Sequence, residues 1–168
     1  FHALREYLPG DERRYIHWKS TARTGKYMVR QFEETRRSHL VVALSLASSD
    51  YGTDAEFEMA VSVAGSLGAR AIRDARTVSV VASEYTPQFA KRKVFAVRLL
   101  STLTRARLLD DLAVVEKSET ALSITDVAKV AGDQATGVSV AFLVCGSTVN
   151  PQELRAASVA FPVGVEVI

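Results

Sequence analysis

The chain has a single cysteine, Cys145, among its 168 residues, and this scarcity excludes a fold held together by disulfides within the chain. It has no apolar run near the roughly 18–20 residues that a membrane-spanning helix needs, and no charged and then apolar leader opens it. Its net charge is only +2 while 48% of its residues are hydrophobic, which excludes wholesale disorder. These absences predict one soluble globular domain with a sizeable core.

The common catalytic motifs are also missing. The sequence has no Gly-x-Ser-x-Gly elbow, no Walker A loop and no dinucleotide-binding glycine pattern after a strand. Cys145 ends an apolar stretch, where ligands bind in open α/β sheets, but a nucleophilic thiol needs a base. His2, His17 and His39 all lie in or beside the N-terminal segment. We therefore expect a buried, unreactive thiol and no enzyme, and a small hydrolase that uses Cys145 is the less favoured alternative.

The modest net charge is the sum of two unlike parts. Residues 1–37 carry nine basic and five acidic residues, which gives +4, and residues 38–168 carry twelve basic and fourteen acidic residues, which gives −2. A basic segment is typical of nucleic-acid or membrane-surface binding, but here aromatic residues are interleaved with the charges. That interleaving favours packing, so we expect no nucleic-acid partner.

Turn and cap residues divide the N-terminal segment. Pro9 and Gly10 predict a turn, after which a short helix is expected over residues 12–22, with Gly25 as its terminator. Residues 27–33 have an imperfect alternation and predict a strand.

Strands and helices alternate through the rest of the chain, which predicts an α/β domain with a doubly wound, mostly parallel sheet. The apolar run at residues 39–46 suits a central strand with helices on both faces. Other strands are expected at 77–82, 94–98, 137–145 and 163–168, and helices at 53–75, 99–113, 123–132 and from 150 onward. We predict that residues 1–37 form a segment packing on an α/β body of residues 38–168.

Two features of the helix at residues 53–75 are specific enough to test. Thr53 and Glu56 fit a capping box, in which Thr53 caps the backbone while Glu56 reaches back. Gly65 and Gly68 make the helix thin, which predicts a close approach to the sheet.

The segment from Leu4 to Glu33 resembles the signature of the domain-of-unknown-function 58 family (DUF58). That signature runs Arg-x-Tyr-x-Pro-Gly-Asp-x-x-Arg-x-Ile-x-Trp and then Ser-Ala-Arg-x-Gly; Thr21 stands where Ser is usual. The matching residues are Arg5, Tyr7, Pro9, Gly10, Asp11, Arg14, Ile16, Trp18, Ala22, Arg23 and Gly25. The rest of the chain is similar to the family only in its α/β order.

The resemblance implies a von Willebrand factor A-like fold. It also implies a bacterial protein that is anchored in the membrane by segments outside this chain, with the domain on the cytoplasmic face. Family members are often encoded beside MoxR-type AAA+ ATPases, so the resemblance implies such an ATPase as a protein partner. The chain is then expected to be part of a longer protein.

Von Willebrand A-type domains often bind Mg²⁺ at a metal-ion-dependent adhesion site (MIDAS) that begins Asp-x-Ser-x-Ser after the first central strand. Here Ser45 replaces the Asp, Ala47 replaces the middle Ser, and only Ser49 remains. Without that carboxylate, the free-energy cost of removing water from Mg²⁺ is hard to offset. We therefore expect a degenerate site and no cofactor. The alternative is a Mg²⁺-dependent adhesion-type domain in which Asp50, one residue further on, replaces the missing ligand.

The signature residues leave two roles open. Either they form an internal salt-bridge and stacking network, or they form a docking surface for a partner, since Arg and aromatic residues favour interfaces. The candidate residues are Arg5, Tyr7, Gly10, Asp11, Arg14, Trp18 and Arg23. If residues 12–22 are helical, Arg14 and Trp18 share a face. The sequence as a whole favours a non-enzymatic protein-interaction domain.

Overall fold

The computed structural model describes residues 3–31, 39–87, 90–134 and 136–168, and the chain forms two compact units, Phe1–Arg36 and Arg37–Ile168. We call them the N-terminal unit and the body. The boundary expected between residues 37 and 38 falls outside the described residues, and the packing of the first segment on the body stays a prediction. Among the described helices, none combines the length and the hydropathy that crossing a bilayer requires.

A two-stranded antiparallel sheet organises the N-terminal unit, in which β1 (Ala3–Glu6) pairs with β2 (Met28–Gln31). The predicted turn follows β1: the Asp11 amide donates to the Leu8 carbonyl at 3.0 Å, and Gly10 has φ +110°. A side chain at Gly10 would be strained at that angle, which is why glycine suits this turn. The turn prediction is confirmed.

The single helix predicted over residues 12–22 is wrong. The segment instead forms a 3-10 turn, η1 (Arg13–Tyr15), and a separate helix, α1 (Trp18–Thr24). Ile16 between them has an extended backbone and bridges to Val29 of β2, so pairing with the strand interrupts the helix. Arg14 and Trp18 therefore do not share a helix face.

The ends of α1 follow capping chemistry. His17 is the N-cap, and its Nδ1 accepts the Ser20 amide at 3.3 Å. Gly25 ends the helix in the left-handed conformation with φ +74°, as predicted. The last two residues of the strand predicted at 27–33 lie outside the described residues.

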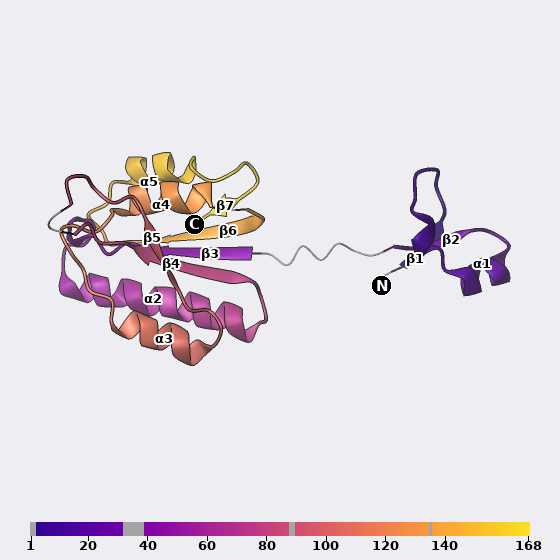
Figure 1. Ribbon diagram of the computed structural model, residues 1–168, viewed down its shortest axis with the longest axis horizontal. Coiled ribbons are helices and arrows are strands. Elements are labelled where there is room, and N and C mark those ends of the chain that lie inside the picture. Colours follow the sequence, from indigo (N-terminus) through magenta and orange to yellow (C-terminus); the bar gives the residue numbers. More distant parts are fainter. Residues whose placement is uncertain (1–2, 32–38, 88–89, 135) are drawn as a thin grey trace. The chain divides into compact units, whose positions relative to one another are not determined.

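The body is built on a five-stranded sheet in the order β5-β4-β3-β6-β7 (Figure 1). Strands β3, β4, β6 and β7 are parallel, and β5 joins one edge antiparallel to β4. This mostly parallel sheet confirms the prediction made from the alternation of strands and helices. The strands are β3 (His39–Leu44), β4 (Val78–Ser83), β5 (Val97–Leu100), β6 (Val138–Val144) and β7 (Glu166–Val167).

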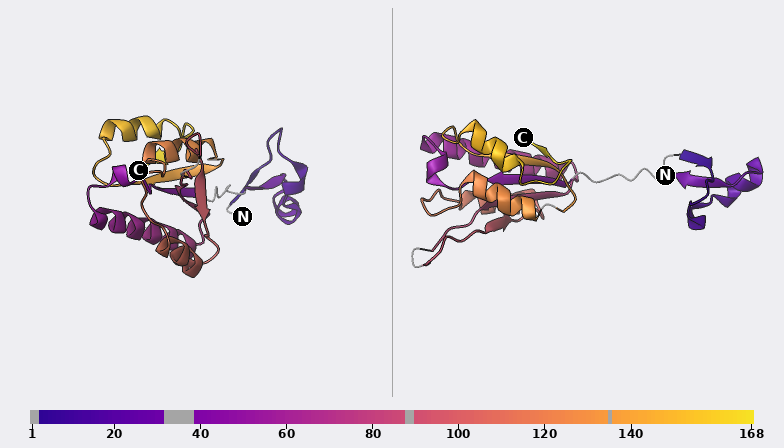
Figure 2. Two further views of the ribbon diagram at one scale, coloured as in Figure 1. Left: turned by 60° about the vertical axis from the view of Figure 1, so that its left-hand side comes forward. Right: turned by 90° about the horizontal axis from the view of Figure 1, so that it is seen from above.

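Helices cover both faces of this sheet, with α2 and α3 on one side and α4 and α5 on the other (Figures 1 and 2). Alternate residues of β3 pack into two separate cores: Val42 and Leu44 face the α2 side, while Val41 and Ala43 face the α4 side. The fold is therefore mixed α/β. The helices of the body are α2 (Asp54–Arg73), α3 (Arg105–Ala113), α4 (Ile124–Asp133) and α5 (Pro151–Ser158).

Strand pairing also displaces the elements predicted after residue 93. The expected strand at 94–98 lies further along, because Val97–Leu100 pair with β4. The helix predicted over 99–113 therefore begins only at Arg105, where the Thr104 hydroxyl accepts a first-turn amide. Helical spacing of leucines cannot reveal that the first of them belongs to an edge strand.

The close approach predicted for α2 is present. Gly65 and Gly68 are buried, and a Cβ on Gly68 would lie 2.5 Å from a Leu108 methyl carbon and 3.0 Å from a Val80 methyl carbon. The absent side chain allows α2 to contact β4 and α3 together.

Candidate functional site

The chain leaves β3 and β6 toward opposite faces of the sheet, to α2 and to α5 respectively. In open α/β sheets the crevice at such a divergence is the usual ligand site. A pocket of about 510 Å³, which we call the strand-end pocket, opens there. It is lined by residues of η2 (Ser48–Asp50), the start of α4, the loop after β6, and α5, among them Ser49, Asp50, Ser123, Thr125, Lys129, Thr148, Glu153 and Ala156.

Asp50 is buried in the wall of the strand-end pocket, with 5% of its surface exposed. Its Oδ2 accepts the Ser45 hydroxyl at 2.5 Å and the Ile124 backbone amide at 2.7 Å. Its Oδ1 accepts the Ser49 hydroxyl at 3.3 Å. The carboxylate therefore caps the first turn of α4, where unpaired helix amides favour a negative charge.

Ser45 organises the loop at the end of β3. Besides donating to Asp50, its hydroxyl accepts the Ala47 amide at 3.2 Å. The Tyr51 hydroxyl donates to the Ser45 carbonyl at 2.7 Å, and burial is the main cause that raises the pKa of Tyr51. The loop is thus held by polar groups that are satisfied internally.

The residues of the expected degenerate metal site, Ser45, Ser49 and Asp50, do meet in space. They supply one carboxylate, and that carboxylate already accepts three hydrogen bonds. No three His, Cys, Asp or Glu side chains gather to hold a metal ion anywhere in the part of the chain that the structure describes. Because Mg²⁺ needs anionic oxygens that are free to coordinate it, this donor set does not fit the ion.

Glu56 joins the loops that follow β3 and β6. The Thr53 hydroxyl accepts the Glu56 amide at 3.2 Å, as the capping box predicts. The Glu56 carboxylate, however, accepts the Gly52 amide at 3.0 Å instead of reaching the Thr53 amide. It also accepts the Ser147 amide at 3.2 Å and the Ser147 hydroxyl at 2.9 Å. These bonds, the one from Gly52 first, lower the pKa of Glu56.

Gly146 allows the same two loops to touch. A Cβ at this position would lie 2.4 Å from the Asp50 carbonyl oxygen and 2.9 Å from the Tyr51 Cα. Both of those atoms belong to the backbone, so they cannot be displaced by a side-chain rotation. The wall of the strand-end pocket therefore depends on a bare backbone at Gly146.

The thiol of Cys145 is poorly suited to nucleophilic chemistry. Burial, and secondarily the charge of Asp50, raises the pKa of Cys145 to about 11, so the thiol stays protonated at neutral pH. His39 is the first residue of β3, at the amino end of the sheet, and its ring bonds Ser79 at 2.8 Å. Cys145 follows β6 at the other end of the sheet, beyond reach of this imidazole.

In the N-terminal unit, Arg5 and Asp11 form a bidentate ion pair. The two guanidinium nitrogens lie 2.7 Å from the two carboxylate oxygens, and the Leu8 amide donates to the same carboxylate at 2.8 Å. The guanidinium, together with the Leu8 amide, lowers the pKa of Asp11. These two signature residues therefore hold the Pro9-Gly10 turn.

The remaining signature residues lie elsewhere on the unit. Tyr7 and Trp18 both contact the ring of Tyr27 edge to face, each with centroids 6.4 Å apart. The Arg14 guanidinium lies 4.9 Å from the Tyr15 ring centroid and pairs with Glu12. Arg23 is exposed in the last turn of α1. The signature thus contains an internal ion pair and, separately, an exposed aromatic cluster.

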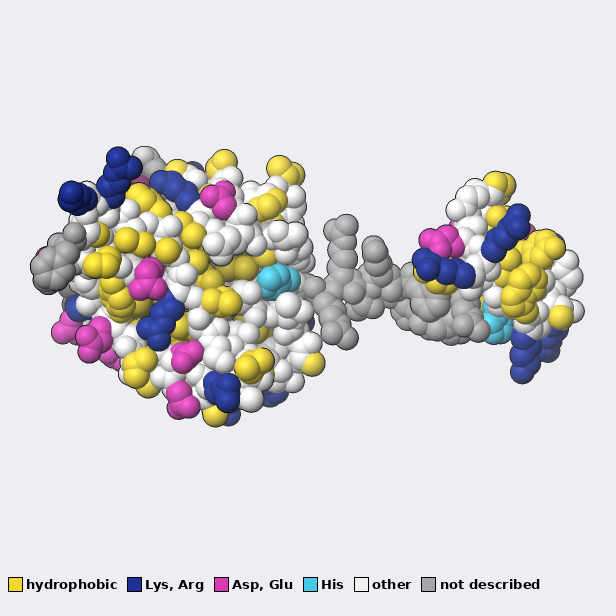
Figure 3. Space-filling view, viewed as in Figure 1, with side chains coloured by type: hydrophobic (Ala, Val, Ile, Leu, Met, Phe, Trp, Pro, Cys, Tyr) yellow, Lys and Arg dark blue, Asp and Glu magenta, His cyan; other side chains and the backbone are white. Residues whose placement is uncertain are grey.

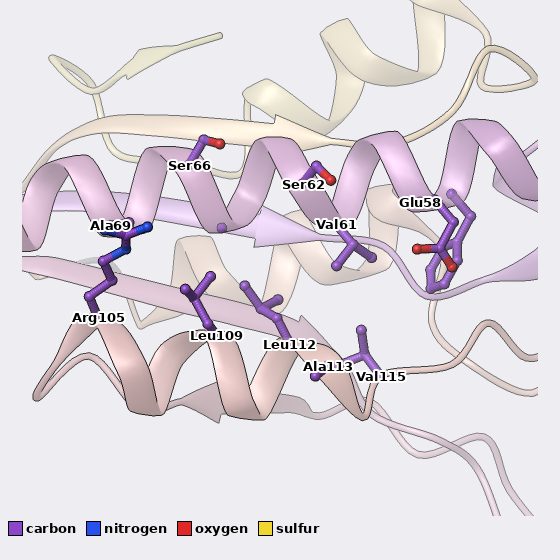
Figure 4. A pocket seen from close by; sticks show the side chains of 12 residues that line it. Glu58, Val61, Ser62, Ser66, Ala69, Arg105, Leu109, Leu112, Ala113 and Val115 are labelled. Carbon is purple, nitrogen blue, oxygen red and sulfur yellow. The ribbon is translucent and has the colours of Figure 1, made fainter.

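A second hollow of about 420 Å³ runs between α2 and α3 (Figure 4). Leu109 and Leu112 point from α3 toward α2, while Glu58 and Arg105 stand at opposite ends (Figure 4). No pair of polar side chains converges within it, so we assign no chemistry to this groove.

Several hydroxyl groups of the strand-end pocket, those of Ser123, Thr125 and Thr148, were not singled out from the sequence. Ser123 and Thr125 lie at the start of α4, and their hydroxyls are 3.0 Å apart, while Thr148 donates to the Ser49 carbonyl at 2.7 Å. A signal for them exists in the sequence, because Ser123 and Thr125 open a predicted helix and Thr148 follows a predicted strand.

Comparison with known families extends the match beyond the N-terminal signature. The family model described as "Protein of unknown function DUF58" matches residues 3–139, which is more than half of the chain. No curated protein has a sequence that matches this one. The family match includes the N-terminal unit and the sheet as far as the start of β6.

Proposed function

The chain belongs to the DUF58 family, whose function is unknown, and on that premise we propose that its body is a non-enzymatic protein-interaction domain of the von Willebrand factor A type. The observation that carries the proposal is the strand-end pocket, a hollow with a mixed polar and apolar lining at the divergence of β3 and β6. Its position matches the ligand site of open α/β sheets, and its walls are held by Asp50, Glu56 and Gly146.

The chemistry around the pocket supports binding over catalysis. The Asp50 carboxylate already accepts the hydrogen bond that caps α4, and the Cys145 thiol is protonated at neutral pH. A catalytic nucleophile needs an adjacent base, and His39 lies at the other end of the sheet. What the pocket offers a partner is a set of hydroxyl groups with Lys129 and Glu153 beside them.

The partner that we propose is a MoxR-type AAA+ ATPase, and the place of binding is the cytoplasmic face of the bacterial membrane. Both follow from the family resemblance of the signature segment. In this proposal the membrane anchor lies in segments outside this chain. The domain presents its strand-end pocket to the ATPase, and the MIDAS in its wall is degenerate.

A pair of matched variants tests this proposal. Ala156 is exposed on α5 and lines the strand-end pocket, so Ala156→Arg fills the pocket without removing a core side chain. Ser66→Arg adds the same bulk and charge to an exposed site on α2, across the sheet. The purified MoxR-type ATPase of the same organism is captured on the immobilised chain. We expect Ala156→Arg to abolish capture and Ser66→Arg to leave it unchanged.

Two results would contradict the proposal in different ways. No capture by the unmodified chain removes this ATPase as the partner. Equal capture by both variants removes the strand-end pocket as the docking site, and it leaves the ATPase as a partner.

The alternative, a Mg²⁺-dependent adhesion-type domain, makes a separate prediction. Because the Asp50 carboxylate is already bonded, titration calorimetry with MgCl₂ or MnCl₂ is expected to give no saturable heat at millimolar concentrations. Ser49 is exposed at the pocket mouth, so Ser49→Ala is a variant that keeps the fold. Millimolar or tighter binding by the unmodified chain that Ser49→Ala removes would establish the metal site.

A further inference from the structure

The N-terminal unit buries little of its apolar surface. Among its described side chains, Val29 is the only one that is buried. Leu8, Trp18 and Tyr27 expose 59%, 64% and 59% of their surfaces. Units of about 40 residues or fewer seldom complete a core on their own, and exposed apolar patches on them mark contact sites.

The exposed rings line a pocket of about 350 Å³, and its described lining residues all come from this unit. We call it the aromatic pocket, and its residues are Tyr7, Arg13, Ile16, Trp18 and Tyr27. The Tyr27 ring stands at 65° to the Tyr7 ring and at 84° to the Trp18 ring. The inclined rings present both faces and edges, and the exposed Arg13 also lines the pocket.

Basic residues outnumber acidic ones among the described residues of the N-terminal unit. Three described acids of the unit are already paired: Asp11 with Arg5, Glu6 with Lys26 and Glu12 with Arg14. Arg13, Lys19 and Arg23 are exposed, and none of them forms an ion pair with a described carboxylate. Figure 3 shows an apolar patch on this unit with Lys and Arg side chains around it.

We propose that the aromatic pocket binds an extended, acidic, proline-containing segment of a partner protein. This proposal rests on the proposed function, because it takes the chain to be an interaction protein. It adds a second binding surface, on the N-terminal unit, to the strand-end pocket of the body. A second copy of the chain would bring the same cations together, so like charges disfavour it. A cationic ligand is disfavoured because Arg13 stands at the pocket.

Each part of such a segment has a matching group in the pocket. Proline-rich segments are held in the extended polyproline conformation before binding, and they dock into grooves lined by Tyr and Trp rings. An acidic side chain beside the proline reaches Arg13, whose guanidinium accommodates a carboxylate in two parallel hydrogen bonds. The exposed Lys19 and Arg23 of α1 add to the positive charge of the unit, which favours an acidic segment.

Trp18 is the only tryptophan of the chain, so its fluorescence reports on the aromatic pocket in the intact 168-residue protein. The probe is the peptide acetyl-Asp-Pro-Glu-Leu-Pro-Asp-amide. We expect a saturable blue shift of the Trp18 emission and protection of this ring from acrylamide quenching. The matched peptide with Lys in place of each acidic residue is expected to cause no shift.

Two substitutions assign the binding to the pocket. Arg13→Ala is expected to weaken peptide binding about tenfold, the loss of one charge-assisted contact. Arg155→Ala removes an equal charge from an exposed site on α5 and is expected to leave the affinity unchanged. The Ala156→Arg variant of the strand-end pocket is also expected to bind the peptide normally. Failure of the aromatic-pocket proposal can therefore be distinguished from failure of the proposed function.

Three outcomes would overturn the proposal. A Trp18 that resists acrylamide quenching before any peptide is added means that the ring is already covered. Equal binding of the acidic and basic peptides removes the charge argument. A saturable shift with single-stranded DNA but none with the acidic peptide makes the surface a nucleic-acid site.

Discussion

Asp50→Ala is expected to lower the free energy of unfolding of the body by about 2–4 kcal/mol. The substitution removes the acceptor of the Ile124 amide, and Ile124 is fully buried, so the first turn of α4 loses the cap of a buried amide. It also removes the acceptor of the Ser45 hydroxyl, which is buried as well. The loss combines an unsatisfied amide, a lost helix cap and a small void.

The measurement is urea unfolding followed by far-ultraviolet circular dichroism, with hydrogen exchange of the Ile124 amide as a local probe. Asp54→Ala is the matched control, because the Asp54 side chain is 88% exposed and pairs only with Lys117 among the described residues. That control is expected to leave the free energy of unfolding almost unchanged, because water screens an exposed ion pair. An unchanged or higher stability of Asp50→Ala would mean that Asp50 does not act as the cap of α4.

Gly146→Ala is expected to destabilise the body by about 3 kcal/mol, through overpacking. The added Cβ would lie 2.4 Å from the Asp50 carbonyl oxygen and 2.6 Å from a Tyr51 ring carbon. Relief requires the backbone after β3 to move away from the backbone after β6. That movement pulls Asp50 from the first turn of α4.

Gly52→Ala is the control for Gly146→Ala, since both glycines lie in the loops that border the strand-end pocket. A Cβ on Gly52 would lie 3.4 Å from a Glu56 carboxylate oxygen, which is an ordinary van der Waals contact. We expect a change within about 0.5 kcal/mol, measured by the same urea unfolding. Similar losses for both variants would show that loop flexibility, and not the close approach at Gly146, sets the cost.

The elements that the sequence predicts well are those whose causes are local. The run at residues 39–46 predicts β3, because continuous apolar residues suit a strand that is covered on both faces. Asn150 and Pro151 predict the start of α5, where the Asn150 side chain accepts the Gln152 amide at 2.9 Å. Each of these signals involves residues a few positions apart.

The predictions that fail depend on partners far away in the chain. Ile16 leaves the helical pattern because it bridges to Val29, and residues 97–100 do so because they pair with β4. Neither partner is visible from the local spacing of apolar residues.

The candidate site divides in the same way. The sequence marks Asp50 by its place after β3, but it suggests a metal ligand there and not a helix cap. The capping bond from the Ile124 amide joins residues 74 positions apart, which the sequence does not reveal. The aromatic pocket draws on Tyr7 and Trp18, both in the signature, and on Tyr27, which the signature does not contain. The geometry that gathers these rings comes from the pairing of β1 with β2.

The parallel pairing of β3 with β6 has a consequence for how the body folds during synthesis. Leu40 is paired with Val140, so the central ladder joins residues one hundred positions apart. Ribosomes add about 5–20 residues per second, so β3 waits roughly 5–20 s for its neighbour. During that interval β4 can cover one edge of β3, while the other edge stays open to incorrect pairing with other chains. Parallel pairing over such a distance forms slowly, so shielding of the open edge of β3 during synthesis is expected to raise the yield of native protein.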